Sequence, residues 1–198
     1  MGGQSLYTDS YSNHVGGVKL VWLTKEEQDR IDSKIYNEVI KKTGKTTPKN
    51  SILEIVTSLG VDVFLVDFDQ KFPQIKKNLS GMIEYPKRTE KAKIFLNSKD
   101  TPERRSFTLA HELGHFLLHK PDVQGRFRLD YQIYIDDQQS KEETEANYFA
   151  ASLLVLKERL LAIMKEINIF NNMSQVADYF GVSELVIRNR LEWLKRNE

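Results

Sequence analysis

Apolar residues recur about every four positions near the start of the chain, which is typical of an amphipathic helix. Thr24 and Glu27 stand three residues apart at the beginning of this pattern and form a capping-box signature. We therefore predict a first helix over 24–42. A second helix is predicted over 47–60, because a Thr-Pro pair opens it and a glycine closes it.

Short apolar runs follow, at lengths typical of strands. The segment VDVFLVDF predicts a mostly buried strand over 61–68. SGMIEYP and AKIFLN predict two further strands over 80–86 and 92–97, and the polar stretch between them indicates a hairpin. Thr-Pro-Glu then marks the start of a helix over 101–119.

The second half of the chain is predicted to be mainly helical. Residues 121–139 show no clear period and are expected to be irregular. Ser140 and Glu143 form another capping-box pattern ahead of the apolar stretch TEANYFAASLLVLKERLLAIM. The last part predicts two short helices around FGVS, with the small, turn and apolar positions of a helix-turn-helix.

Composition narrows the class of protein. The 198 residues carry a net charge of +1, so no global field attracts nucleic acid. The absence of cysteine excludes disulfides and thiolate zinc sites and fits a reducing cytoplasm. No apolar run approaches the ~20 residues of a membrane span, so no membrane association is expected.

The stretch FTLAHELGHFLLHK contains an H-E-x-x-H motif formed by His111, Glu112 and His115. Residues four apart lie on one face of a helix, so both imidazoles could bind one Zn²⁺ ion at ~2.0–2.1 Å. Glu112 lies about 100° around the helix, where it could hold a metal-bound water and accept its proton. Zinc lowers the pKa of such a water towards ~7. The alternative is an apolar packing helix with solvent-facing histidines.

His119 continues the four-residue spacing but is not expected to be a ligand. It has rotated about 80° from His111, so three histidines on one straight helix do not converge on a tetrahedral ion. We predict that His119 caps the helix or supports a ligand. His14 lies in the predicted tail and is a poorer candidate still.

The third ligand is expected to be a carboxylate on another element, because catalytic zinc usually has three protein ligands. Glu142, Glu143 and Glu145 are all available in the next helix. Glu143 and Asn147 share a face, which could present the carboxylate to zinc and the amide to a ligand histidine. Glu143 could equally close the Ser140 capping box, and an acidic first turn is favoured by the helix dipole. Spacing does not decide among the three.

RRSFTLAHELGHFLLH followed by EETEANYFAASLL resembles the ImmA/IrrE family of zinc-dependent metallopeptidases, over roughly residues 60–154. The resemblance implies an α+β fold, a compact zincin-like domain with a small sheet packed on the active-site helix. It implies that His111, His115 and Glu143 hold zinc and that Glu112 is the general base. Glu145 is the second choice for the third ligand.

With this resemblance, we predict a flexible tail over 1–17, a zincin-like domain over 18–160, and a helical, helix-turn-helix-like segment over 161–198. Family members often have Met-Pro where this chain has Val155 and Leu156. The helix is therefore expected to run on towards Met164.

The family's activity implies a cytoplasmic endopeptidase that cleaves a helix-turn-helix repressor encoded nearby. Such repressors govern mobile elements, prophages or stress genes. Tyr131, Tyr134 and Tyr148 are candidates for stabilising the oxyanion, and the sequence does not choose among them. An interaction module with a structural metal is a further alternative, which the presence of Glu112 disfavours.

The rival function is a DNA-binding transcriptional regulator with a metal-sensing or vestigial zinc site. Its DNA contacts would come from four basic residues of the C-terminal segment, Arg188, Arg190, Lys195 and Arg196. Four acidic residues balance them, Asp178, Glu184, Glu192 and Glu198. This balance is poor for binding phosphates, so a packing role is favoured and direct DNA binding is not expected. Trp193 is accordingly predicted to be a core residue.

Overall fold

The computed structural model describes residues 14–15, 18–19, 22–71, 79–85, 91–119, 127–131 and 141–196. The strands are β1 (His14–Val15), β2 (Val18–Lys19), β3 (Asp62–Val66), β4 (Leu79–Glu84), β5 (Lys93–Asn97) and β6 (Phe127–Tyr131). The helices are α1 (Lys25–Lys34), the π-helix η1 (Ile35–Ile40), α2 (Lys41–Thr43), α3 (Ile52–Ser58), α4 (Phe68–Lys71), α5 (Pro102–Leu118), α6 (Lys141–Leu154), α7 (Lys157–Glu166), α8 (Met173–Phe180) and α9 (Glu184–Lys195). Most of the predicted tail and Ser140 lie outside the described residues.

The main sheet has the strand order β3-β5-β4-β6. β3 runs parallel to β5, whereas β4 is antiparallel to both β5 and β6, which confirms the predicted hairpin pairing. The strand predicted over 61–68 is present as β3, but the prediction that it is mostly buried was wrong. β3 lies at one end of the strand order, so Phe64 and Leu65 are exposed, and the chain is already helical at Phe68.

β6 corrects a second prediction, because it lies within the segment 121–139 that was expected to be irregular. Met82 of β4 pairs with Leu129 of β6, and the register shifts between Leu79 and Gly81. The sequence FRLDY alternates apolar and polar residues, which is the period of a half-buried strand. Five alternating residues are too short a run to predict a strand within an otherwise irregular segment.

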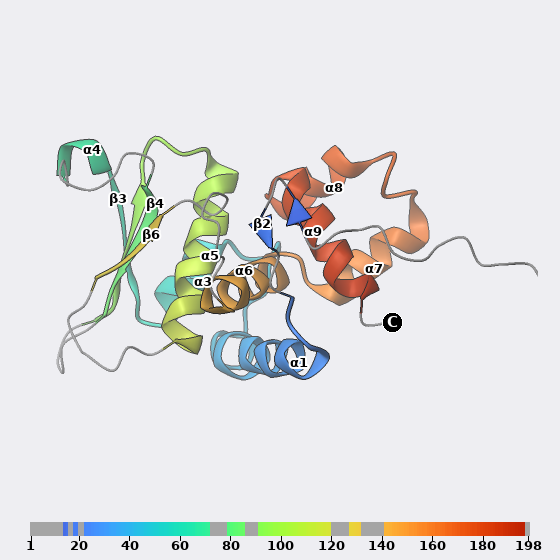
Figure 1. The fold of residues 1–198 in the computed structure, drawn as a ribbon, viewed down its shortest axis with the longest axis horizontal. Helices are drawn as coiled ribbons and strands as arrows, with labels where there is room; N and C mark the ends of the chain where they lie inside the picture. Colours follow the sequence, from blue (N-terminus) through green and yellow to red (C-terminus); the bar gives the residue numbers. More distant parts are fainter. Residues whose placement is uncertain are drawn as a thin grey trace, which may run out of the picture.

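The sheet packs on α5, and α6 lies on the other side of α5 (Figure 1). α1 covers α6, and the C-terminal helices extend the molecule beyond it (Figure 1). One hydrophobic core runs through these layers, with Ile83 of the sheet, Leu113 of α5, Phe149 of α6 and Ile187 of α9 all fully buried. The observed architecture is the predicted α+β fold, a small sheet on the active-site helix followed by a helical segment.

Capping residues define where the first two predicted helices begin, and a glycine follows the end of the first. Thr24 forms the predicted capping box with Glu27, and Gly44 ends the helical stretch in the left-handed conformation at φ 66°. The second helix begins later than predicted. Ser51 caps α3 and forms a capping box with Glu54, so the preceding residues form a turn. The Ser-x-x-Glu spacing was the signal that the prediction missed.

The helix that follows residue 140 does not run on towards Met164, which corrects another prediction. α6 ends at Leu154, and α7 begins at Lys157. The Thr47 hydroxyl donates to the carbonyls of Leu153 and Leu154 at 2.6 and 3.0 Å, and Arg190 Nε donates to the carbonyl of Val155 at 3.2 Å. The last two carbonyls of α6 and the carbonyl that follows them are thus satisfied by side chains distant in sequence, which allows the helix to end without proline.

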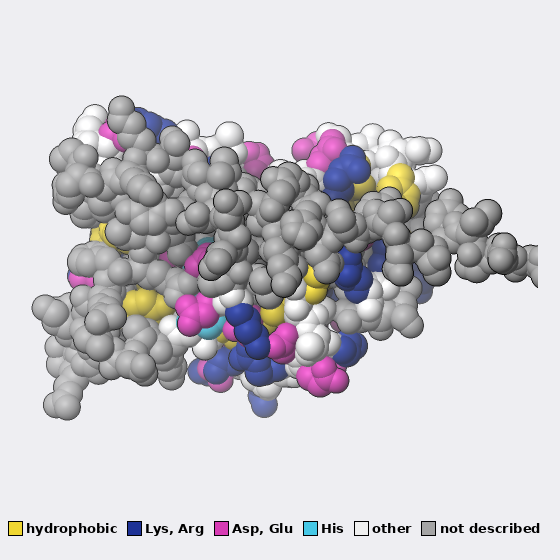
Figure 2. Space-filling model, viewed as in Figure 1, with side chains coloured by type: hydrophobic (Ala, Val, Ile, Leu, Met, Phe, Trp, Pro, Cys, Tyr) yellow, Lys and Arg dark blue, Asp and Glu magenta, His cyan; other side chains and the backbone are white. Residues whose placement is uncertain are grey.

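The C-terminal segment forms the predicted pair of short helices. α8 ends at Phe180 and is followed by Gly181, whose φ of 64° is in the left-handed region, and α9 begins at Glu184. Trp193 of α9 is buried as predicted and contacts the rings of Trp22 and Tyr148 edge-on. On the described part of the face in Figure 2, basic and acidic side chains are interspersed.

Candidate metal centre

The candidate site is built on α5, the central helix. Thr101 caps this helix by accepting a hydrogen bond from the Arg104 amide, and Pro102 stands in its first turn. His111, Glu112 and His115 lie in the middle of α5, and all three are buried. Polar side chains so deeply buried need partners, since burial without them is unfavourable. The packing-helix alternative with solvent-facing histidines does not fit these positions.

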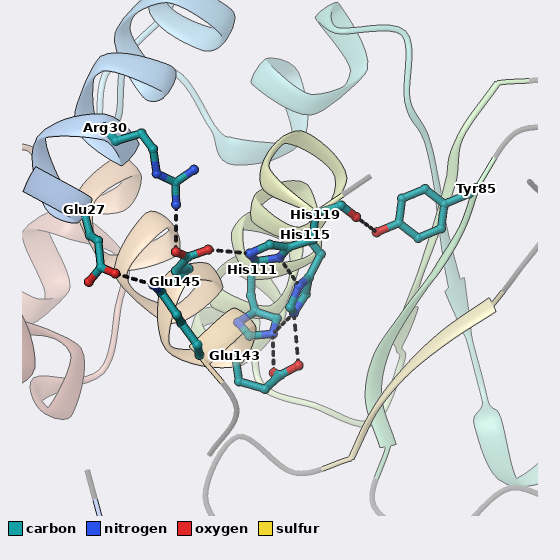
Figure 3. A network of polar contacts seen from close by, with 9 residues as sticks. Glu27, Arg30, Tyr85, His111, His115, His119, Glu143 and Glu145 are labelled. Carbon is teal, nitrogen blue, oxygen red and sulfur yellow. Dashed lines mark hydrogen bonds and ion pairs between the residues drawn. The ribbon is translucent and has the colours of Figure 1, made fainter. Parts of the chain in front are cut away.

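Three side chains from two helices converge beside α5. The Nε2 atoms of His111 and His115 are 3.0 Å apart. Glu143 of α6 places Oε2 3.3 Å from the first of these atoms and Oε1 3.4 Å from the second (Figure 3). Ligand atoms ~2.0–2.1 Å from a tetrahedral ion are ~3.3 Å from one another. The observed spacings are close to this value, so the donor set fits a zinc-sized ion. These three residues form a candidate metal-binding group among the described residues.

Electrostatics support a charged Glu143. Its burial opposes ionisation and is the largest influence on its pKa. Contacts with the rings of His111 and His115 outweigh this influence, and together they hold the pKa of the carboxyl well below its usual range. Glu143 is therefore an anion facing two nitrogen donors. Two imidazoles and one carboxylate form a donor set that zinc favours.

Glu112 lies between α5 and the sheet and is fully buried. β4 passes very close to it at Gly81. A Cβ atom at this glycine would be 2.8 Å from Glu112 Oε1 and 2.3 Å from Thr108 Cγ2. Only a residue without a side chain allows the strand to approach α5 so closely. The backbone of β4 at Gly81 therefore limits the movement of the Glu112 carboxylate towards the sheet.

His119 and Glu145 are neighbours at the edge of this group (Figure 3). His119 is the C-cap residue of α5, and its Nδ1 lies 2.9 Å from His115 Nδ1. Its Nε2 lies 2.8 Å from Glu145 Oε2, and Arg30 donates to the other carboxylate oxygen at 2.7 Å. Glu145 thus faces His119 and Arg30, while Glu143 faces the two motif histidines.

Asn147 and Gly114 lie where α5 and α6 pack together. Asn147 is half-buried, and among the described residues its Oδ1 accepts no hydrogen bond, so its support of a ligand histidine stays a prediction. Gly114 of α5 lies against the Phe149 side chain of α6, whose atoms would be 3.1 to 3.2 Å from an added Cβ.

Sequence reasoning missed a polar cluster that joins α1, α6 and α9. Tyr148 of α6 donates its hydroxyl to Asp32 of α1 at 3.1 Å, and the guanidinium carbon of Arg190 lies 5.4 Å from the centre of the Tyr148 ring. Burial raises the pKa of the Asp32 carboxyl and of the Tyr148 hydroxyl. Tyr148 is therefore engaged in helix packing. The side chain of Tyr131 and all of Tyr134 lie outside the described residues.

Comparison with known proteins agrees with this geometry. A family model described as the IrrE N-terminal-like domain, which represents a peptidase family, matches residues 57–192. The match covers both motif-bearing helices and most of α9. The chain belongs to the ImmA/IrrE family of metallopeptidases.

A relative within this family supports the assignment. Metallopeptidase ImmA of Bacillus subtilis (strain 168) is 26% identical over 159 residues, which span 80% of this chain and 85% of that protein. The family assignment confirms the predicted resemblance and identifies a metallopeptidase. Within the described residues, no helix is both long and apolar enough to cross a membrane.

Proposed function

We propose that the protein is a cytoplasmic zinc endopeptidase that cleaves a helix-turn-helix repressor encoded nearby. The observation that carries the proposal is the convergence of His111, His115 and Glu143 donor atoms at 3.0 to 3.4 Å. Membership of a metallopeptidase family supports it independently. We propose zinc because the set combines two imidazole nitrogens with one carboxylate.

In this proposal His111, His115 and Glu143 hold the ion through Nε2, Nε2 and a carboxylate oxygen. When bound, zinc supplies Lewis acidity that polarises the scissile carbonyl and acidifies the attacking water. The Glu112 carboxylate accepts a proton from this water and delivers it to the leaving amine nitrogen as the C–N bond breaks. Burial against β4 limits the movement of this carboxylate. The Glu112 carboxylate therefore occupies a narrow range of positions when proton transfer begins.

The substrate proposal rests on the family. ImmA is the name of the related metallopeptidase, and the ImmA/IrrE resemblance implies cleavage of DNA-binding repressors. The absence of cysteine is compatible with a cytoplasmic location. A selective protease of this kind needs a docking surface as well as a catalytic site, which agrees with the additional C-terminal helices.

The structure gives little support to the rival DNA-binding function. Arg190 is buried against α6, and the Arg196 guanidinium carbon lies 3.7 Å from the centre of the Trp22 ring. Arg188 and Lys195 are exposed, but each lies near a glutamate of the same helix, at 3.6 and 3.5 Å. Two of the four candidate phosphate contacts are therefore used in packing, and the other two are partly neutralised.

Cleavage of the neighbouring repressor is the direct test. The zinc-loaded protein should convert the purified repressor into two defined fragments, and Glu112→Gln should leave it intact while retaining zinc. Glu142→Gln is the matched control, because it removes a carboxylate from an exposed position of α6. An intact repressor after incubation with the zinc-loaded wild-type protein would contradict the proposed substrate. DNA binding that weakens steeply with salt would favour the rival function.

The proposed third ligand has its own test. Glu143→Ala removes a donor atom, so this variant should retain little zinc after dialysis. Glu145→Ala leaves all three donors in place and should still take up one zinc ion when the metal is in excess. The reverse pattern in metal analysis would show that Glu145 is the ligand.

A further inference from the structure

A chain of four polar side chains connects the surface of α1 to His115 (Figure 3). Arg30 donates to Glu145 Oε1, Glu145 Oε2 contacts His119 Nε2, and His119 Nδ1 contacts His115 Nδ1, at 2.7, 2.8 and 2.9 Å. The residues come from α1, α6 and the end of α5. Arg30 is half-exposed, whereas the Glu145 and His119 side chains are less than a tenth exposed. We call these four residues the Arg30–His115 chain.

The proton positions in this chain can be deduced in order, starting from the ion pair between Arg30 and Glu145. A carboxylate paired with arginine only accepts hydrogen bonds, so Nε2 of His119 must be the donor to Glu145. When the His119 ring is neutral it has one donor and one acceptor nitrogen, so its Nδ1 accepts. His115 must then donate from Nδ1. Its Nε2 is then the unprotonated ring nitrogen, and this atom lies 3.0 Å from His111 Nε2 and 3.4 Å from the Glu143 carboxylate.

We propose that Glu145, held by Arg30, acts through His119 to fix His115 in the tautomer that can bind a metal ion at Nε2. Glu145, Arg30 and His119 are thus positioning residues. The inference rests on the proposed function, because it treats His115 as a ligand. It also argues against Glu145 as the third ligand, since Arg30 and His119 each contact one of its oxygens.

The first test reads the proton positions directly. Nitrogen NMR of the full chain labelled with ¹⁵N-histidine distinguishes the two imidazole tautomers, and only four histidines are present, so His119→Gln and His14→Gln assist the assignment. Without metal, His115 should be protonated at Nδ1 and His119 at Nε2. Glu145→Gln should increase the population of the other His115 tautomer. A His115 ring protonated at Nε2 in the wild-type protein would overturn the proposal.

The second test measures zinc affinity by competition with a coloured chelator. Loss of a partner that orients a metal-binding histidine typically weakens metal binding about 10- to 100-fold, and we expect this for Glu145→Gln. Arg30→Ala should weaken binding about 5-fold or less, because its ion pair is partly exposed. Arg30→Lys should restore most of this loss by returning the charge.

Two matched variants control for charge. Lys25→Ala removes an exposed cation that pairs with Asp29 on the same helix as Arg30, and Glu142→Gln removes a carboxylate from the same turn as Glu145. Both should bind zinc as the wild-type protein does. Wild-type zinc affinity in Glu145→Gln would overturn the proposal. Neither test uses a substrate, so a protein that binds zinc as expected but leaves every repressor intact would contradict only the proposed function.

Discussion

β4 approaches α5 closely at Gly81, and alanine there should impair both stability and catalysis. The new methyl group would lie 2.3 Å from Thr108 Cγ2 and 2.8 Å from Glu112 Oε1. The first contact is more than an ångström shorter than an ordinary carbon–carbon contact of ~3.5 Å. β4 and α5 must therefore separate, or both side chains must move.

The expected magnitude follows from two opposing effects. Overpacking a well-filled interior destabilises by about 1–3 kcal/mol. Replacing glycine in a strand recovers roughly 0.5–1 kcal/mol, because alanine loses less conformational entropy on folding. We expect a net loss of about 1–2 kcal/mol in the free energy of unfolding. A shift of ~1 Å in a catalytic group can lower the rate about 100-fold, so kcat should fall by up to that factor.

Urea unfolding and the rate of repressor cleavage test the two effects separately. Thr108→Ser removes the Cγ2 atom but leaves the contact with Glu112. The double variant Gly81→Ala/Thr108→Ser should therefore recover most of the stability, measured against Thr108→Ser alone, while its kcat stays low. Gly81→Ala with wild-type stability and kcat would refute the reasoning. A double variant that recovers both properties would show that Glu112 is not displaced.

Two further predictions concern the polar cluster that joins α1, α6 and α9. Burial raises the pKa of the Asp32 carboxyl in the folded protein above its usual value of about 3.8. The stabilisation that comes from the protonated carboxyl is therefore fully present below about pH 3.8. It is lost as the pH rises through the folded-state pKa. The unfolding free energy of the wild-type protein relative to Asp32→Asn should therefore fall as the pH rises from 3 to 7 in metal-free urea titrations, and a flat or rising difference would contradict this. Arg190→Met should cost about 3 kcal/mol in the same assay at neutral pH, since it leaves Asp32 and the Val155 carbonyl without a buried cation. Arg188→Ala, at an exposed position of the same helix, should change stability by less than about 0.5 kcal/mol.

Local signals in the sequence were sufficient for the central helix and its motif. Thr101 and Pro102 mark the start of α5, and the four-residue spacing places His111 and His115 on one face. Gly181 likewise marks the turn between α8 and α9. Each of these features depends on residues that are near one another in the chain, so the pattern contains the necessary information.

Features that depend on tertiary contacts were not predictable in this way. Thr47 donates to the Leu154 carbonyl at the end of α6, and Arg190 donates to the carbonyl of Val155 just after it. These contacts join residues 107 and 35 positions apart in the chain. Arg190 looked like a candidate DNA contact because its charge is visible in the sequence, whereas its burial is not. β3 looked like a buried strand because an apolar run does not reveal that it lies at one end of the sheet.

The choice of the third donor depends on the rotation of α6 about its own axis. Successive residues are about 100° apart on a helix, so a rotation of that size would replace Glu143 with Glu142 at the motif histidines. Two contacts oppose such a rotation, Phe149 against Gly114 of α5 and Tyr148 against Asp32 of α1. The same orientation brings Glu145 to His119. The packing of the core therefore decides which carboxylate faces the histidines, and this is why neither residue spacing nor the capping pattern could decide it.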